Sequence, residues 1–223
     1  MKLKTSSSKC VCILVLFLLI FGNSMEQQEV PVLNIEKKTG CVGDLVKVNV
    51  SLSEAPQGIS GYNITWVLSN ASIAEIESIE IPSWGSNFLS KNSSLPASYV
   101  YVRAIDLGMQ VEENTTNIPI ITLLLRTKLY GNSTIYISRF RMDDDDDRRI
   151  NPVIENGSIF VYQRGDLNDN SEVADIGDVL LIWRAYLGLQ ATNCRYDMNQ
   201  NGVEADIGDV LLLWQLWQNK GAS

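Results

Sequence analysis

The sequence contains no histidine, and this absence excludes several kinds of active site. The chain lacks the commonest general base, the commonest zinc ligand and the base of a Ser–His–Asp triad. Basic residues are also fewer than acidic ones, 18 against 26, so the formal charge is −8 at pH 7. An acidic chain of this kind disfavours nucleic acids and anionic membranes as partners and favours cations.

Long hydrophobic runs are scarce, and the clearest one lies at the N-terminus. Residues 10–21 are all apolar, but these 12 residues are fewer than the roughly 20 needed to span a bilayer. Lysines precede the run and small residues follow it: Lys2, Lys4, Lys9, Gly22 and Ser24. This order is typical of a signal peptide, with an uncleaved membrane anchor as the alternative. We therefore expect residues 1–24 to be removed and the mature chain to be secreted, extracellular and associated with the cell surface.

Cysteine is rare as well. Of the four cysteines, Cys10 and Cys12 belong to the expected signal peptide, so only Cys41 and Cys194 remain after processing. Two cysteines are too few for a disulfide scaffold. A bridge between them is possible in an oxidising compartment, and two unpaired thiols are the alternative.

The middle of the chain, residues 30–163, is rich in alternating β-branched and aromatic residues. Alternation of this kind is typical of half-buried strands. The segments that alternate are 45–52, 62–68, 99–105, 120–127, 133–140 and 157–162. Gly, Pro, Asn and Ser separate them, and no helical pattern is sustained. The sequence therefore predicts a mainly β sandwich over residues 30–163.

Two polar features of this region point to its surface. Seven Asn-X-Ser/Thr sequons make glycosylation of some sites plausible in a host with the machinery. They are Asn49, Asn63, Asn70, Asn92, Asn114, Asn132 and Asn156. In addition, five consecutive aspartates run from Asp143 to Asp147. Adjacent carboxylates point apart, so we expect a solvated turn there and not a cation site.

The order of the predicted strands resembles a cohesin module. The segment GDLVKVNV at 43–50 is similar to an early strand of that family, and GISGYNITWVL at 58–68 is similar to the next. The segment NGSIFV at 156–161 is similar to its last strand. The resemblance implies a jelly-roll-like sandwich that takes part in protein–protein interaction.

The last part of the chain contains an internal repeat, since residues 166–183 return as 197–214. Both copies carry Asp or Asn at loop positions 1, 3, 5, 10 and 13. Calcium takes six to eight hard oxygen ligands, and a tight loop with this spacing brings such oxygens to one centre. We expect two Ca²⁺ ions. Their predicted ligands are Asp166, Asn168, Asn170, the Glu172 carbonyl and Asp178, and Asp197, Asn199, Asn201, the Val203 carbonyl and Asp209. Asp175 and Asp206 are the alternative closing carboxylates.

A helix is predicted after each loop. Apolar residues fall at i, i+3, i+4 and i+7 in both copies. They are Val179, Ile182, Trp183 and Tyr186, then Val210, Leu213, Trp214 and Trp217. We expect these stripes to pack the two helices together, with Gly188 ending the first helix.

Residues 165–223 resemble the dockerin family, whose modules pair two loop–helix units without the entering helix of a full EF-hand. The lengthened loops are closest to the Ala-Asp-X-Gly-Asp loops of dockerin-like modules on archaeal surface proteins. The resemblance implies partner recognition by the residues before each closing aspartate, here Ile176 and Gly177, and Ile207 and Gly208. The implied partners are cohesin-type or dockerin-type modules on other chains.

The two loops are expected to differ in affinity. Loop position 6 needs a positive φ, which suits Gly202 but costs Ser171 on the order of 1 kcal/mol. The first site should therefore bind calcium more weakly than the second, and both should bind weakly because each has few carboxylates.

The chain should dock to other molecules and not to itself. The linker of about three residues spans at most about 10 Å, whereas the sandwich should be about 35 Å across.

These observations favour a non-catalytic adaptor or scaffold in polysaccharide-associated surface assemblies. The alternative is a carbohydrate-binding module anchored through its dockerin, with a platform of Trp66, Trp84 and residues 99–101. Catalysis is not expected, because nothing places two carboxylates such as Asp106 and Glu112 or Glu113 across a cleft.

Overall fold

The computed structural model describes residues 30–85, 88–91 and 94–221. The expected signal peptide and the sequon at Asn92 lie outside these residues. Within them, no helix combines the length and the apolar character needed to cross a membrane.

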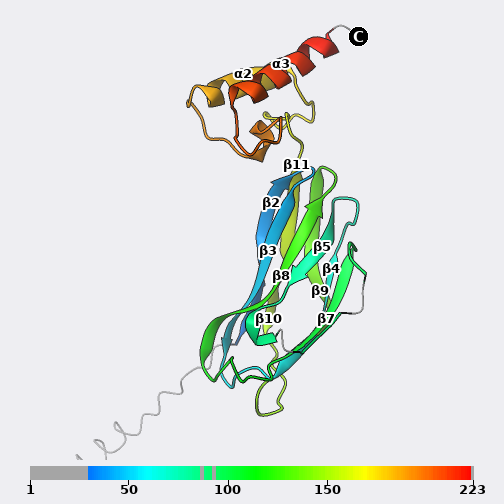
Figure 1. The fold of residues 1–223 in the computed structure, drawn as a ribbon, viewed down its shortest axis with the longest axis vertical. Coiled ribbons are helices and arrows are strands. Elements are labelled where there is room, and N and C mark those ends of the chain that lie inside the picture. Colours follow the sequence, from blue (N-terminus) through cyan, green and yellow to red (C-terminus); the bar gives the residue numbers. More distant parts are fainter. Residues whose placement is uncertain (1–29, 86–87, 92–93, 222–223) are drawn as a thin grey trace, which may run out of the picture. The chain divides into compact units, whose positions relative to one another are not determined.

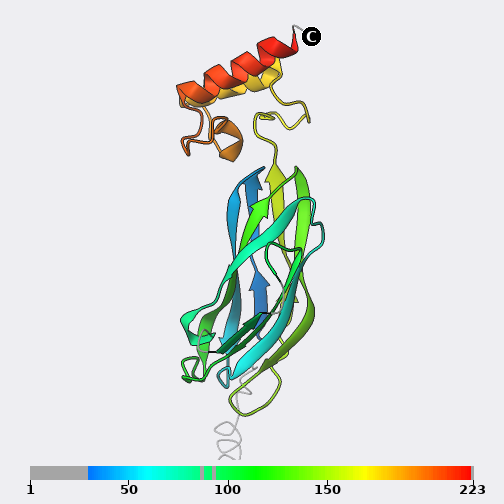
Figure 2. The same cartoon turned by 45° about the vertical axis from the view of Figure 1, so that its right-hand side comes forward.

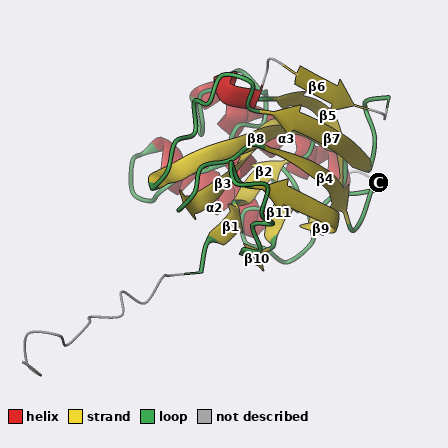
Figure 3. Cartoon of the chain, turned by 90° about the horizontal axis from the view of Figure 1, so that it is seen from below, coloured by secondary structure: helices red, strands yellow, loops and turns green. Residues whose placement is uncertain are grey.

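Two β-sheets pack face to face and form a sandwich (Figures 1 and 3). The first has the strand order β10-β1-β3-β8-β5, and the second has the order β2-β11-β9-β4-β7-β6. The strands are β1 (Val32–Ile35), β2 (Lys37–Cys41), β3 (Leu45–Ala55), β4 (Gly61–Leu68), β5 (Ala74–Glu80), β6 (Phe88–Lys91), β7 (Tyr99–Ile105), β8 (Thr115–Thr127), β9 (Gly131–Asp143), β10 (Val153–Glu155) and β11 (Gly157–Tyr162). All six segments that alternate in the sequence are strands.

The alternation of side chains explains the core. In β4, Tyr62, Ile64, Trp66 and Leu68 are buried while the residues between them face outward. The buried residues of both sheets form one apolar cluster. Trp66 is fully buried and Trp84 nearly so, and the Trp84 indole donates to the Pro119 carbonyl at 2.8 Å. These two tryptophans are core residues, so the platform suggested for carbohydrate binding is wrong in this respect.

One segment near the N-terminus serves both sheets. β1 pairs with β3 and β10 in the first sheet, while β2 runs parallel to β11 in the second. Only Glu36 separates β1 from β2, and its N–H donates to the Asn49 carbonyl. This switch ties the two sheets together at one edge of the sandwich.

Two helices follow the sandwich, α2 (Ile176–Tyr186) and α3 (Ile207–Lys220), with the 3₁₀ turn η2 (Cys194–Tyr196) between them. They lie alongside each other in both Figures 1 and 2. Their inner residues pack on the loops in a second apolar cluster that includes Val179, Ile182 and Leu213. After α2, Gly188 has a φ of +70° and its N–H donates to the Ala185 carbonyl, as expected of a helix-ending glycine.

Covalent and polar contacts join the helical region to the end of β2. Cys41 and Cys194 form a disulfide, which decides the question left open by the sequence. Arg164 pairs with Asp44 and also donates to the Cys194 carbonyl. The Arg195 guanidinium lies 4.7 Å from the centre of the Tyr162 ring. The helical region is therefore held at two points, by the linker and by the disulfide.

Candidate calcium loops and docking surfaces

The first loop gathers polar side chains around its turn. The Asp166 carboxylate accepts from the N–H groups of Asn170 and Ser171, at 3.1 and 3.0 Å. Asn168 Oδ1 accepts from the Asn170 N–H, and Asn170 Oδ1 accepts from the Glu172 N–H. The side-chain oxygens of positions 1 and 3 thus meet at one N–H group, that of position 5, and the position 5 oxygen accepts from the N–H of position 7.

The second loop repeats this arrangement. The Asp197 carboxylate accepts from the N–H groups of Asn201 and Gly202, both at 3.1 Å. Asn199 Oδ1 accepts from Asn201, and Asn201 Oδ1 accepts from Val203. Since the repeated residues make the repeated contacts, the two loops have the same fold.

Asp178 and Asp209, the predicted closing carboxylates, are fully buried. Asp178 accepts from the N–H groups of Leu167, Asn168 and Asp175 at 2.7 to 3.2 Å. Asp209 accepts from those of Asn199 and Asp206 at 3.0 and 2.9 Å. Burial raises the pKa of both carboxyl groups, against the hydrogen bonds that lower it. Each buried carboxylate therefore holds the backbone of its own loop in place through these hydrogen bonds.

Asp175 and Asp206 face the asparagines of their loops. The Asp175 carboxylate accepts from the Asn168 amide at 3.1 and 3.2 Å and also from the Asn170 amide. Asp206 accepts from the Asn199 and Asn201 amides at 3.4 and 2.7 Å. The backbone N–H of Asp178 lowers the pKa of Asp175, and the Asn201 amide lowers that of Asp206. Of the four candidate closing carboxylates, Asp175 and Asp206 are therefore the two that contact the side chains of loop positions 3 and 5.

The same two aspartates cap the helices. Asp175 accepts from the Asp178 N–H at 2.9 Å, and Asp206 accepts from the Asp209 N–H at 3.1 Å. In return, the carboxylates of Asp178 and Asp209 accept from the N–H groups of Asp175 and Asp206, so each helix begins with a capping box. In each unit, the same two carboxylates therefore close the loop and begin the helix. They are Asp175 and Asp178 in the first unit and Asp206 and Asp209 in the second.

Gly177 and Gly208, two of the predicted docking residues, leave room for this closure. A Cβ on Gly177 would lie 2.7 Å from the Asn168 amide nitrogen and 2.9 Å from an Asp175 oxygen. A Cβ on Gly208 would meet Asn199 and Asp206 at 2.8 and 2.9 Å. Ile176 and Ile207, the other two, are about half exposed and remain available to a partner.

Three positions of each loop are left-handed, and one of them distinguishes the loops. Asp169, Ser171 and Ala174 have positive φ in the first loop, and their counterparts do so in the second. Position 6 has a φ of +71° at Ser171 and +84° at Gly202. The conformation expected to disfavour serine is therefore present, while the predicted difference in calcium affinity remains a prediction.

The donor set fits calcium in chemical type. Each loop offers carboxylate and amide oxygens and a backbone carbonyl, which are hard ligands, and no sulfur or imidazole. Among the Cys, Asp and Glu side chains of the described residues, the group of three that comes within metal-binding distance of one another is Cys41, Asp44 and Cys194. Because these two cysteines are joined as a disulfide, that group offers no thiolate.

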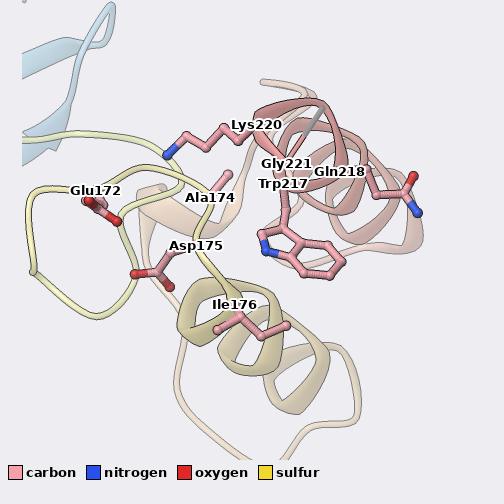
Figure 4. Close-up of a pocket in the computed structure, with 8 residues that line it drawn as sticks. All are labelled: Glu172, Ala174, Asp175, Ile176, Trp217, Gln218, Lys220 and Gly221. Atoms are coloured by element: carbon pink, nitrogen blue, oxygen red, sulfur yellow. The ribbon is translucent and has the colours of Figure 1, made fainter. Parts of the chain in front are cut away.

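A hollow of about 810 Å³ separates the first loop from the end of α3 (Figure 4). Glu172, Asp175 and Ile176 line it on one side and Trp217 and Lys220 on the other. Figure 4 shows Lys220 extending from α3 toward the loop, where its ammonium donates to the Val173 carbonyl. The last turn of the second unit thus contacts the loop of the first.

The aromatic stripes of the helices are more exposed than the sequence predicts. Val179, Ile182, Val210 and Leu213 are buried as expected. However, the exposed fractions of Trp183 and Tyr186 are 41% and 45%, and that of Trp214 is 36%. The expectation that the aromatics pack between the helices is wrong for Trp183, Tyr186 and Trp214. Trp217, the fourth aromatic of the predicted stripes, is half-buried and packs on the second apolar cluster.

Trp183 and Trp214 belong to a surface that we call the helix stripe. It repeats at i, i+4 and i+7 on each helix, with every member more than a third exposed. The helix stripe consists of Ile176, Leu180 and Trp183 on α2 and Ile207, Leu211 and Trp214 on α3.

The outer face of the second sheet carries a second surface, which we call the tyrosine–arginine face. Strand register places its members on three neighbouring strands. They are Tyr99, Tyr101 and Arg103 on β7, Asn63, Thr65 and Val67 on β4, and Tyr136, Arg139 and Arg141 on β9. A hollow of about 690 Å³ lies on this face. It is lined by Thr65, Val67, Tyr99, Tyr101, Ser138 and Arg139.

The acidic run is not uniformly solvated as expected. Asp144 is buried, and its carboxylate accepts from the N–H groups of Asp146 and Arg148 at 3.0 and 2.7 Å. Asp145, Asp146 and Asp147 are exposed. A carboxylate bonded to its own turn can be buried, and this possibility was missed in the sequence.

Comparisons with known proteins identify the sandwich fold. No family model and no curated protein matches the chain. A cohesin of Clostridium thermocellum, solved in a cohesin–dockerin complex, is 17% identical with a TM-score of 0.52, covering 60% of this chain and 94% of that one. A non-cellulosomal cohesin of the archaeon Archaeoglobus fulgidus is 13% identical with a TM-score of 0.51, covering 60% and 92%. The sixth cohesin of Acetivibrio cellulolyticus scaffoldin B, in complex with a Cel5 dockerin, is 21% identical with a TM-score of 0.52, covering 60% and 100%. The sandwich of this chain is cohesin-like.

Proposed function

We propose that this protein is a secreted, non-catalytic adaptor that docks to other proteins through interactions of the cohesin–dockerin type. The observation that carries the proposal is the match of the sandwich to cohesins over nearly their whole length, in structures where the cohesin is bound to a dockerin. The same chain also contains two loop–helix units with matching loop hydrogen bonds. Its partners are dockerin-type or cohesin-type modules, and its place is outside the cell at the cell surface.

The second part of the proposal is that one Ca²⁺ binds to each loop and stabilises the helical region. The repeated gathering of Asp166, Asn168 and Asn170, and of Asp197, Asn199 and Asn201, supports it. The Glu172 and Val203 carbonyls and the buried Asp178 and Asp209 complete the proposed ligand sets, with Asp175 and Asp206 against the asparagines. Two short helices bury little apolar surface, so bound metal should contribute much of their stability.

Calcium titration of the mature chain tests the metal. We expect two binding events followed by tryptophan fluorescence and calorimetry, and a chelator should lower the melting temperature of the helical region only. Asp166→Ala and Asp197→Ala should each remove one event. A titration without binding, or one unchanged by both variants, would contradict the calcium sites.

Docking is tested by capture on the immobilised mature chain, with calcium or with a chelator. Captured proteins are identified, purified and bound again in isolation. Support requires a purified partner that carries a dockerin-type or cohesin-type module. If purified cohesin-type and dockerin-type modules from the same host all fail to bind, the adaptor function is wrong.

Carbohydrate binding is the second candidate, because Tyr99 and Tyr101 remain on the outer face of the sheet beside a hollow. Aromatic rings on a flat sheet can stack on sugars, although Trp66 and Trp84 do not contribute. A polysaccharide pull-down with Tyr99→Ala and Tyr101→Ala as controls separates this candidate from protein docking.

A further inference from the structure

The helix stripe is an apolar surface that a small helical unit does not need for its own core. The inner sides of α2 and α3 already pack on the loops through Val179, Ile182 and Leu213. Leu180 and Leu211 are nevertheless 58% and 54% exposed, and the stripe is present twice. Exposed apolar residues that recur along one side of a helix are typical of an interaction site.

The tyrosine–arginine face has the composition of a protein-binding surface. Tyrosine and arginine are enriched where interfaces bind most strongly. Along β4, β7 and β9 the outward positions carry three arginines and one carboxylate, Asp143, which pairs with Arg141 at 2.7 Å. On the outer side of the other sheet, Lys47, Arg126 and Lys128 pair with Glu80, Glu77 and Glu75.

The two surfaces are complementary in charge as well as in apolar character. Residues 165–221 contain nine acidic and three basic residues, so their formal charge is −6, or −2 with one Ca²⁺ in each loop. Exposed Glu172 and Glu204 lie in the loops that precede the stripe, together with Asp169, which pairs with Arg195 of the same chain. Acidic residues in the loops before an apolar stripe fit a face on which tyrosines lie among arginines.

The helix stripe cannot readily reach the same face of its own chain. Gly131, at the start of β9, pairs with Val161 beside the linker, and Arg139 lies eight residues further along that strand. This separation is about 26 Å along the strand. The linker spans at most about 10 Å, and the Cys41–Cys194 disulfide adds a second tether. The partner of the stripe is therefore another molecule.

We propose that the helix stripe of one copy docks on the tyrosine–arginine face of a second copy, so that the protein forms head-to-tail chains. The proposal rests on the docking function above and names a second copy of this chain as the partner. Pairing of two helix stripes is disfavoured, since it brings two acidic regions together. Contacts between unlike surfaces do not close on themselves unless the rotation allows a ring, so oligomers of increasing size result.

Sedimentation velocity of the mature chain in calcium tests the proposal. We expect a concentration-dependent series of monomer, dimer and larger species. Leu180→Glu combined with Leu211→Glu should abolish the series by placing charge on the stripe. Arg139→Glu should weaken association about tenfold or more. Arg148→Glu, the same charge change in the exposed acidic turn, should leave the series unchanged.

Mixing the variants gives the decisive result. The stripe variant retains its sheet face, and a face variant with Arg139→Glu and Tyr101→Glu retains its stripe. Each should be monomeric alone, and the mixture should form a 1:1 dimer that grows no further. Circular dichroism confirms that both variants are folded.

Other outcomes overturn the proposal. A face variant that still dimerises alone would mean that like stripes pair. A wild-type chain that stays monomeric at high concentration in calcium would exclude self-assembly. The adaptor function would survive that last result if a separate purified module still bound.

Discussion

At the scale of single residues, position 6 of the two loops offers a matched pair. Ser171 has a φ of +71°, a conformation that disfavours any residue with a Cβ, while its counterpart is Gly202. We expect Ser171→Gly to tighten calcium binding at the first loop by about fivefold, equivalent to about 1 kcal/mol. Gly202→Ser should weaken the second loop to a similar extent. Calcium titration of the full mature chain measures both, and a first site already tighter than the second would contradict the prediction.

Asp178 is the residue on which the fold of the first loop most depends. It is fully buried and accepts from three backbone N–H groups, which an amide in its place could satisfy only in part. We expect Asp178→Asn to lower the free energy of unfolding of the helical region by about 3 kcal/mol. The hydrogen bonds to a charged carboxylate would be lost, and the NH₂ group of the asparagine would face backbone N–H groups, which are also donors. Chemical denaturation in the presence of a chelator removes any contribution of metal.

The control for this variant is Glu204→Gln, which neutralises an exposed carboxylate near the second loop. It should leave the unfolding free energy within about 0.5 kcal/mol of the wild type. Equal effects of the two substitutions would mean that net charge, and not the buried hydrogen bonds, sets the stability.

At the scale of elements, the turn η2 connects the first loop to the sandwich through Arg195. Its guanidinium donates to the Asp166 carbonyl at 3.2 Å and to Asp169 at 2.6 Å, and it lies over Tyr162. We expect Arg195→Ala to lower the melting temperature of the helical region, at a cost of about 2 kcal/mol. Arg184→Ala, on the exposed side of α2, is the matched control and should change little. Differential scanning calorimetry resolves the effect, and an unaltered helical transition in Arg195→Ala would disprove the connection.

The elements also show how far the sequence determines the fold. Alternation located β3, β4, β7, β8, β9 and β11, because long half-buried strands have a strong period of two. It did not locate β1, β2, β5, β6 and β10, four of which have five residues or fewer. The pairing of β1 and β2 with different sheets depends on contacts with distant strands, which no local pattern records.

The candidate site was predictable to a similar degree. The loop spacing correctly indicated that Asp166, Asn168 and Asn170 gather, since a tight turn imposes that geometry. Helical periodicity showed which residues share a side of α2, but not how deeply each is buried. Trp183 and Trp214 are therefore on the expected helices but on an exposed surface.

At the scale of the whole molecule, glycosylation at Asn63 and the proposed self-assembly would use the same face. Asn63, a sequon residue, is an outward residue of β4 and accepts from the Tyr101 hydroxyl at 3.3 Å. It pairs in register with Arg103 and Arg141. A glycan on Asn63 would cover the tyrosine–arginine face, so we expect chains that carry one to remain monomeric in calcium. Asn114 is an exposed sequon residue in the turn directly before β8, and it provides the comparison.

Protein from a glycosylating host, analysed by mass spectrometry and light scattering, provides the measurement. Asn63→Gln should restore head-to-tail association, whereas Asn114→Gln should not, because a glycan at Asn114 leaves the face open. Enzymatic removal of glycans should have the same effect as Asn63→Gln. Undiminished assembly of chains fully glycosylated at Asn63 would show that this face is not the docking surface, since a bulky hydrated sugar excludes a partner from the strands that bear it.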